Sequence, residues 1–544
     1  MFSSPTSHTT NLNLNEHAIT TEELHPMKAD LALINANIIT MNPANPHAEA
    51  IAIKKDYILK IGKNTDIPPL IGKNTKVQDV YGKTILPGFI DTHIHIADFG
   101  RTLNWLDLKN TDSIQAIQEA IKRKTQTTPK NKWILGSGWN QNNLKEKRSP
   151  TRQDLDEAAP NNPVVIYHQL GRTCTTNTKA LKKANITQNT PNPKNGTISK
   201  NPQTNTPTGI LHGNATDLIW SKIPPPTQQE NLESTKNAIQ KIIEAGITTA
   251  HWIISTKNEL AIAKKLTQQN QPLRIYTIIT AKLLETLPNS NHTIPKINAA
   301  LIFTDGYLAS QTAALDKPYT DNPSNKGTLL YTQGELNRLV AKIQQANIQV
   351  IIHATGDKAI DAALKALETN PTNKTPHRIE QAAVLNKKLI QRIKKQNLTI
   401  SIQPQVIQSE FTTWQAIQHL GNKRAKMLYP TNTLLSKKIV VAGGSDCPME
   451  PLNPLAGMQS AAIRKFAANE RITVDDALRI YTVHAAYSAS EEDVKGSLEE
   501  GKIADLTVLS NDPTSVAPDK IDSIKVELTI IGGKVLYQRK PFIN

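Results

Sequence analysis

The sequence has only two cysteines, Cys174 and Cys447, among its 544 residues. So few cysteines exclude a disulfide framework and every zinc site that is built from cysteine alone. A metal ion in this chain must therefore be held by His, Asp, Glu or a modified Lys. Hydrophobic residues make up 38% of the chain, so the chain is globular rather than disordered.

Long apolar runs are also missing from the sequence. No stretch of about 18 apolar residues occurs, so we expect no membrane span. The first 26 residues are polar and aperiodic, and they lack the basic start and the apolar core of a signal peptide. We therefore expect residues 1–26 to form a disordered tail and the protein to be cytoplasmic.

Acidic residues are fewer than basic residues, with 47 Asp and Glu against 63 Lys and Arg and a formal charge of +16. A basic surface can bind nucleic acid. The lysines, however, are spread along the whole chain with few aromatic residues between them, and no nucleic-acid motif accompanies them. We therefore predict no nucleic-acid partner and attribute the excess of positive charge to a general bias in amino-acid composition.

The hydrophobic pattern differs between the ends and the middle of the chain. Residues 27–85 and 490–544 contain short alternating segments broken by Asn, Gly and Pro, which is typical of a small antiparallel unit. Over residues 86–489, apolar strands such as VVIYHQL, IQVIIHATG and KKIVVAGGSD alternate with amphipathic helical stretches. This alternation favours an α/β fold, either a parallel barrel or a doubly wound sheet. The polar stretch 187–209 predicts a surface loop near the barrel mouth.

Two histidines lie one residue apart in the stretch LPGFIDTHIH. On a strand, His93 and His95 point to the same side. His353 and Asp446 end later apolar strands, and in a parallel barrel all strand ends of this kind meet on one rim. Three imidazoles and one carboxylate suit Zn²⁺, with Fe²⁺ and Mn²⁺ as alternatives. Two histidines at this spacing are more often core or surface residues than metal ligands. The later candidate ligands make the metal site the favoured interpretation.

Seven motifs in order along the chain resemble a known family. They are LPGFIDTHIH at 86–95, GSGWNQ at 136–141, TDGYLASQTAAL at 304–315, HATGDKAIDAAL at 353–364, HRIEQ at 377–381, GGSDCPMEPLNPL at 443–455 and KGSLEEGKIADLTVL at 495–509. With these motifs the chain resembles the amidohydrolase superfamily, and within it the amidohydrolase 3 branch of YtcJ-like proteins. The resemblance covers residues 28–540. It implies a distorted TIM (β/α)8 barrel over 86–489 and a small β-sandwich domain built from both chain ends.

The resemblance also implies the ligands of a metal site and shows where this chain departs from the family. His93, His95, His353 and Asp446 match metal-binding positions. Three other positions do not match. Leu301 replaces a lysine that can bridge two metals, Gln381 replaces the histidine of the motif RIEH, and Arg172 replaces the histidine of an Asp-Gly-His motif. Because leucine cannot bridge two ions, we expect a single divalent metal ion.

The function that the resemblance implies is hydrolysis of a non-peptide carbon–nitrogen bond in a small molecule by a metal-activated water. Asp446 would be the catalytic residue that moves the proton from the water to the leaving nitrogen. The candidates for substrate binding are Gln381, Arg172, Asp305 and Gly306, although the last two have a role in shaping a turn as an alternative. Since dimers are common in the superfamily, the resemblance also implies a homodimer.

Two other functions remain open from the sequence. Leu301 and Gln381 favour a pseudoenzyme that keeps the fold and binds a ligand or a partner. The four intact metal ligands favour a working hydrolase, because a site without a function would lose ligands at random. A metal-dependent deaminase, or other lyase-like chemistry at the same site, is a further candidate.

Overall fold

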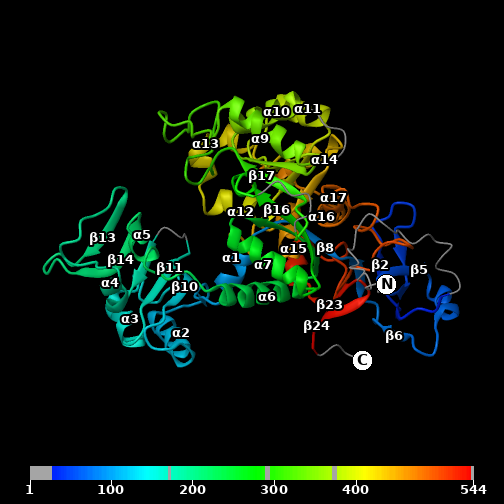
Figure 1. Ribbon diagram of the computed structural model, residues 1–544, viewed down its shortest axis with the longest axis horizontal. Helices are drawn as coiled ribbons and strands as arrows, with labels where there is room; N and C mark the ends of the chain where they lie inside the picture. The colour runs from blue at the N-terminus through cyan, green and yellow to red at the C-terminus, as the bar shows by residue number, and fades with distance from the viewer. Residues whose placement is uncertain (1–26, 170–172, 288–293, 371–375, 541–544) are drawn as a thin grey trace, which may run out of the picture. The chain divides into compact units, whose positions relative to one another are not determined.

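The computed structural model describes residues 27–169, 173–287, 294–370 and 376–540. The predicted tail at 1–26 and Arg172 therefore lie outside the described residues. The chain divides into two compact units, of which one contains the residues up to 96 and from 239 onward and the other contains residues 97–238. Figure 1 shows the helices and strands, with labels on many of them.

Eight parallel strands form the barrel of the first unit. In sheet order they are β8 (Phe89–Ile94), β15 (Ile247–Ile254), β16 (Arg274–Thr280), β17 (Ala299–Phe303), β18 (Gln349–Ala354), β19 (Arg378–Gln381), β20 (Thr399–Ile402) and β21 (Val441–Gly443). A parallel bridge between Ile94 and Cys447 brings the chain after β21 next to β8 and nearly closes the ring. This arrangement confirms the predicted barrel and excludes the doubly wound sheet.

Helices follow the barrel strands, and several of them are amphipathic. They include α7 (Lys257–Gln268), α9 (Gln333–Gln345), α10 (Asp357–Thr369), α11 (Lys387–Lys395), α12 (Pro404–Thr412), α13 (Ala416–Ala425), α14 (Thr431–Ser436), α15 (Pro454–Ile463), α16 (Val474–Ile480) and α17 (Val483–Tyr487). In α9, Leu336, Val340 and Ile343 are buried at a spacing that puts them on one face. Thr332 and Glu335 form a capping box that fixes the start of this helix.

Strands from both chain ends pair with one another in the first unit. The six-stranded sheet has the order β24 (Lys534–Gln538), β23 (Val526–Ile531), β22 (Leu506–Leu509), β7 (Thr84–Pro87), β2 (Asn37–Ile39) and β3 (His47–Ala48). A four-stranded sheet has the order β5 (Tyr57–Gly62), β4 (Ala50–Lys54), β1 (Leu31–Ile34) and β6 (Lys76–Asp79). Because β7 and β22 are antiparallel neighbours, the chain ends share one sheet, as the resemblance implies.

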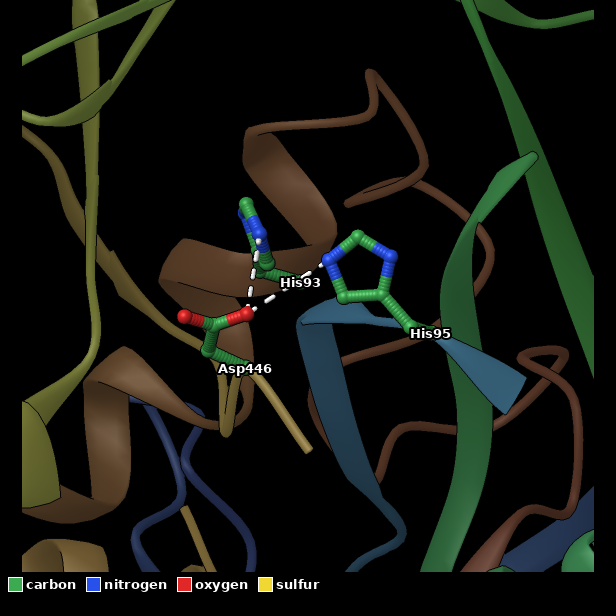
Figure 2. Close-up of side chains that lie close together, drawn as sticks. All are labelled: His93, His95 and Asp446. Carbon is green, nitrogen blue, oxygen red and sulfur yellow. Dashed lines mark ion pairs between the residues drawn. The ribbon is translucent and has the colours of Figure 1, made fainter. Parts of the chain in front are cut away.

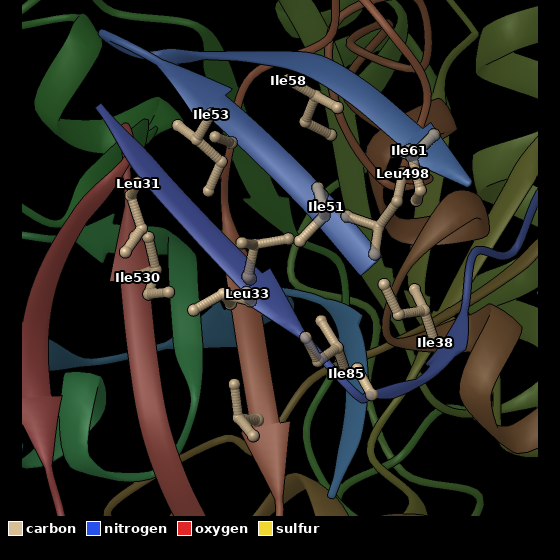
Figure 3. Packing of buried hydrophobic residues seen from close by; sticks show 14 of the residues in the cluster. Leu31, Leu33, Ile38, Ile51, Ile53, Ile58, Ile61, Ile85, Leu498 and Ile530 are labelled. Atoms are coloured by element: carbon tan, nitrogen blue, oxygen red, sulfur yellow. The ribbon is translucent and has the colours of Figure 1, made fainter. Parts of the chain in front are cut away.

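An apolar core lies between these two sheets. Leu31, Leu33, Ile51, Ile53, Ile58 and Ile61 come from one sheet, and Ile85, Leu506, Val508, Leu528 and Ile530 come from the other (Figure 3). Burial of each such side chain stabilises the fold by about 1.5–3 kcal/mol. The sandwich therefore has an aliphatic core of its own.

The second unit is built on a separate six-stranded sheet. Its order is β13 (Gly196–Lys200), β14 (Pro207–Gly213), β12 (Thr173–Thr176), β11 (Val164–His168), β10 (Ile134–Trp139) and β9 (Leu106–Asp107). The helices α2 (Ile114–Thr127), α3 (Arg152–Ala158), α4 (Thr178–Lys183) and α5 (Thr216–Trp220) belong to the same unit. The chain passes between the units through α1 (Ile96–Leu103) and α6 (Gln228–Glu244).

Two sequence expectations need correction in this second unit. The run VVIYHQL, which we expected among the barrel strands, forms β11 of this separate sheet. The stretch 187–209, predicted as a loop, contains β13 and the start of β14, which pair antiparallel. Ile198 explains that pairing, because its side chain is buried against Leu211 and Cys174. No helix in the described ranges is long and apolar enough to cross a membrane.

The sandwich core gives a stability prediction. Leu33→Ala should lower the free energy of unfolding by about 2–5 kcal/mol, because it leaves a cavity at a fully buried position. Val77→Ala, at a position on β6 that is 41% exposed, is the matched control and should change stability by less than about 0.5 kcal/mol. Calorimetric melting of both variants checks this, and equal melting temperatures would contradict the packing described.

Candidate metal centre

Three predicted ligands meet where β8 ends and where the chain leaves β21. The Nε2 atoms of His93 and His95 each lie 3.5 Å from Oδ1 of Asp446. Figure 2 shows both imidazole rings next to this carboxylate. One ligand atom from each of the three residues lies within 4.8 Å of the other two. The structure thus brings together His93, His95 and Asp446 as the strand ends predicted.

Hydrogen bonds to the backbone hold the Asp446 loop against β8. The Asp446 N–H donates to the carbonyl oxygen of His93 at 2.8 Å, and the His95 N–H donates to that of Cys447 at 3.0 Å. Buried Asp91 accepts the backbone N–H groups of His93 and Ser445 on one oxygen, at 3.1 and 3.0 Å. Burial raises the pKa of Asp91 to about 6 despite these hydrogen bonds. Asp91 therefore positions the loop that carries Asp446.

Glu380 fixes the orientation of the His93 ring. Its Oε2 lies 3.1 Å from Nδ1 of His93, and its Oε1 lies 2.7 Å from Arg378, with both Glu380 and Arg378 fully buried. Because Glu380 accepts the Nδ1 proton, Nε2 is the nitrogen that faces Asp446. Burial lowers the pKa of His93, but the charges of Glu380 and then Asp446 outweigh burial and raise it. The two carboxylates thus favour a positive charge at this position.

His353 lies beside these three residues but is not part of the close group. Its ring centre is 6.5 Å from that of His93, and Phe303 and Tyr307 contact it at 5.0 and 5.7 Å between ring centres. Among the described residues, nothing forms a hydrogen bond with its buried Nδ1. Burial, together with the nearby His93, lowers the pKa of His353 to about 4. His353 is therefore neutral at pH 7, which is the form that binds metals.

This donor set fits a divalent metal ion. A site for Zn²⁺, Fe²⁺ or Mn²⁺ offers oriented imidazole nitrogens and a carboxylate. The residues at this rim provide these, together with a buried imidazole nitrogen that has no hydrogen-bond partner among the described residues. Leu301 offers no ligand atom, and it packs inside the barrel against Ile253, Ile278 and Ile351. The apolar surroundings of Leu301 disfavour a second ion there.

The predicted substrate-binding residues fall into different roles. Gln381 ends β19 with a left-handed φ of 70°, and its Nε2 donates to the Tyr429 hydroxyl at 2.6 Å. Asp305 accepts backbone N–H groups from Ala314, Thr355 and Gly356 at 2.8–2.9 Å, on both of its oxygens. Its carboxylate therefore holds loops together, which favours the turn-shaping alternative.

Gly306 belongs to the same turn as Asp305. A Cβ atom at Gly306 would overlap the Thr312 side chain, so the close approach of the chain requires glycine. The Gly306 N–H also donates to the carbonyl oxygen of Thr312 at 3.3 Å. This is the environment of a turn residue.

Sequence reasoning missed three polar residues of the site. Glu380 lies inside the motif HRIEQ, and its alternation with Arg378 on a buried strand was the available signal. Tyr307 lies inside the motif TDGY. It is 46% exposed, and partial shielding from water, with Asp446 and Asp305 adding to it, raises its pKa to about 12. Tyr429 gives no signal in the sequence, yet burial, with Glu410 and Asp446 contributing, raises its pKa well above its usual value. Both phenols are therefore protonated at neutral pH.

Comparison with known proteins agrees with this geometry. The model of the family described as "Amidohydrolase family" matches residues 76–537. The chain belongs to the amidohydrolase family. It is 33% identical over 477 residues to the "Putative amidohydrolase YtcJ" of Bacillus subtilis, covering 84% of this chain and 90% of that protein.

Two further similarities extend over nearly the whole chain. The N-substituted formamide deformylase of Arthrobacter pascens is 26% identical over 541 residues, covering 94% of this chain and 98% of that protein. The crystal structure of an uncharacterized metal-dependent hydrolase from Pyrococcus horikoshii has a TM-score of 0.72 and 26% identity, covering 90% of this chain and 99% of that one. These similarities therefore extend over both the barrel and the sandwich.

The role of Glu380 gives a prediction for metal affinity. Glu380→Gln removes the charge that holds the His93 ring, so zinc affinity should fall about 10–100-fold. Competition with a chromophoric chelator measures this, with exposed Glu119→Gln as the control that should bind zinc as the unaltered protein does. Unchanged affinity in Glu380→Gln would show that His93 does not depend on Glu380.

Proposed function

We propose that the protein is a metal-dependent hydrolase of a non-peptide carbon–nitrogen bond in a small amide, with a single ion held by His93, His95, His353 and Asp446. The observation that carries the proposal is the buried His93 imidazole, which Glu380 orients toward Asp446. The names of two relatives, an amidohydrolase and an N-substituted formamide deformylase, support the same bond type. Zinc is the ion that we favour, with iron and manganese as alternatives.

The residues at this rim have distinct roles in such a reaction. A bound divalent ion lowers the pKa of water so that hydroxide is available near neutral pH. Asp446 accepts the proton of the attacking water and delivers it to the nitrogen as the carbon–nitrogen bond breaks, which yields a carboxylic acid and an amine. Tyr307, whose pKa is raised to about 12, keeps its proton and donates a hydrogen bond to the carbonyl oxygen on which charge develops.

The pseudoenzyme remains the second candidate because of two residues. Leu301 removes a bridging position, and Gln381 cannot exchange a proton near neutral pH. If the site has lost its chemistry, the protein binds a ligand or a partner on the same fold. The metal content and the turnover of simple amides separate the two candidates.

Wider features of the protein are also part of the proposal. We propose that it acts in the cytoplasm on a small molecule, without nucleic acid, and as a homodimer. We also propose the domain bounds 27–85, 86–489 and 490–544, with residues 97–238 as an insertion within the barrel segment. Sedimentation equilibrium tests the homodimer, and a monomer at micromolar concentration would contradict it.

Metal analysis is the first test of the proposed function. The purified protein should contain about one zinc, iron or manganese ion per chain, and His93→Ala should lose this ion together with hydrolysis of N-alkylformamides. Exposed His47→Ala is the matched control and should keep both. About two ions per chain would contradict the single-ion site, and no ion after reconstitution would favour the pseudoenzyme.

Tyr307 gives a separate prediction for the chemical step. Tyr307→Phe should lower kcat by about 10²–10³-fold without changing the metal content, because it removes one donor to the developing charge. Tyr81→Phe, at a side chain that is 57% exposed, is the control and should keep the original kcat. A kcat in Tyr307→Phe equal to that of the control would exclude this role.

A further inference from the structure

A buried histidine that the proposed function does not use lies inside the barrel. His251 on β15 is fully buried, and its Nδ1 lies 3.0 Å from Nη1 of Arg378 on β19. In sheet order β15 and β19 are four strands apart in a ring of eight, so their contact crosses the barrel interior. Arg378 precedes Glu380 by two residues on the same strand, so it lies one layer deeper below the rim.

The chemistry of the two side chains fixes the direction of this hydrogen bond. A guanidinium has five N–H donors and no acceptor, and it stays charged in proteins. Nη1 of Arg378 is therefore the donor, and Nδ1 of His251 is the acceptor. A neutral imidazole that accepts on Nδ1 carries its proton on Nε2. Burial and then the charge of Arg378 lower the pKa of His251 well below its usual value, in agreement with the neutral form.

Stacking on Tyr276 holds the His251 ring in place. Tyr276 is its neighbour on β16, with 4.6 Å between the ring centres and 28° between the ring planes. The Tyr276 hydroxyl donates to Oε1 of Gln349 on β18 at 3.1 Å, which holds the phenol in turn. The buried Nε2 of His251 has no hydrogen-bond partner in the part of the chain that the structure describes. The polar function of this ring is thus the hydrogen bond that it accepts from Arg378.

Arg378 joins His251 to the metal centre. Its Nη2 donates to the carbonyl oxygen of Thr92 at 3.2 Å and lies 2.7 Å from Oε1 of Glu380. The other oxygen of this carboxylate, Oε2, lies 3.1 Å from Nδ1 of His93. The four side chains from His251 to His93 are each at most 3% exposed. A continuous row of direct contacts therefore leads from His251 to a proposed metal ligand.

The acceptor at His251 determines how the Arg378 guanidinium is oriented. Nε of Arg378 already has no hydrogen-bond partner among the described residues. Without His251, Nη1 would also be buried without an acceptor, which is unfavourable because no water replaces the lost hydrogen bond. The guanidinium is planar and rigid, so turning Nη1 toward another partner would move Nη2 away from Glu380.

Stability alone explains this polar layer poorly. Barrel interiors are usually filled by branched apolar side chains, and a buried ion pair contributes little to the stability of a fold. A guanidinium, a carboxylate and an imidazole occupy this interior instead. The geometry that they impose is the better explanation, and it ends in the contact of Glu380 with His93.

We propose that His251 is a positioning residue of the metal centre, which accepts the Arg378 hydrogen bond and so fixes the Glu380 carboxylate against Nδ1 of His93. This inference rests on the metal site of the proposed function and not on the reaction at that site. The row of contacts leaves Nε2 of His93 as the nitrogen for the ion.

Two variants of nearly equal shape test this role through zinc affinity. His251→Asn keeps a carbonyl acceptor for Arg378, whereas His251→Leu fills the space without an acceptor. Both lose the stacking on Tyr276, so the difference between them reports the hydrogen bond. Chelator competition should give a zinc affinity about 10-fold or more weaker in His251→Leu and within about 3-fold of the unaltered protein in His251→Asn. Equal zinc affinities in the two variants would overturn the inference.

A double-mutant cycle tests whether the effect passes through Glu380. In the Glu380→Gln background, His251→Leu should change the zinc affinity by less than about 3-fold, because the carboxylate that His251 positions is already absent. A full loss in that background would show a general loosening of the barrel and would overturn the inference. If His251→Leu does not fold, His251→Met replaces it, because the flexible thioether adapts to the space and is a weak acceptor.

Metal-free crystal structures distinguish a failure of this inference from a failure of the proposed function. If the unaltered protein binds no zinc, the proposed metal site fails, and the structures of the two variants carry the test. His251→Asn should keep Glu380 in contact with Nδ1 of His93, and His251→Leu should separate the two groups. A contact that persists in both variants would overturn the inference, whether or not the protein binds zinc.

Discussion

The buried contact of Glu380 with Arg378 and His93 is the interaction on which the rest of the site depends. An ion pair without solvent contact, such as that of Arg378 with Glu380, contributes little or nothing to stability on its own, because both charges lose their hydration. Here the pair joins β19 to β8, since Arg378 also donates to the carbonyl oxygen of Thr92 at 3.2 Å. The carboxylate thereby selects the nitrogen that His93 presents to the rim. A cation bound at that rim, with Asp446 on its other side, would complete the balance of charges.

Buried carboxylates that accept backbone N–H groups organise the loops around this centre. Asp91 joins the start of the Asp446 loop to β8, and Asp305 joins the loop after β17 to the start of α10. Burial raises the pKa of each to about 6, because both carboxyl groups are shielded from water. The placement of the loops that carry Asp446 and follow β17 thus depends on buried carboxylates that bind backbone N–H groups.

Local spacing made part of the site predictable. His93 and His95 share a side because they are two residues apart at the end of β8. His353 lies at the end of another strand of the same barrel, and Asp446 follows the end of a third. The contact of Gln381, Tyr429 and Glu410 had no such signal, because it joins a strand end, a loop and a helix that no periodicity connects. The role of Asp305 was left open, since only the structure gives the three N–H groups that occupy its oxygens.

The fold shows the same division between local pattern and long-range pairing. The alternation of strands and helices predicted a parallel barrel or a doubly wound sheet, and the family resemblance implied the barrel. The similar patterns at both chain ends predicted their shared sheet. The run at β11 was apolar enough for a barrel strand, but an apolar run does not specify which sheet it joins. Ile198 and Leu211 decided the pairing of β13 and β14 through a contact that the polar composition of 187–209 concealed.

The most direct measurement of the central claim is X-ray absorption at the zinc edge of the zinc-loaded protein. A single ion held by His93, His95, His353 and Asp446 predicts nitrogen and oxygen neighbours at about 2.0–2.2 Å, with the outer-shell scattering of imidazole rings. A metal neighbour at about 3.5–4 Å would contradict the single-ion site. A sulfur neighbour at about 2.3 Å would contradict the ligand set, because it would require a cysteine in the coordination shell.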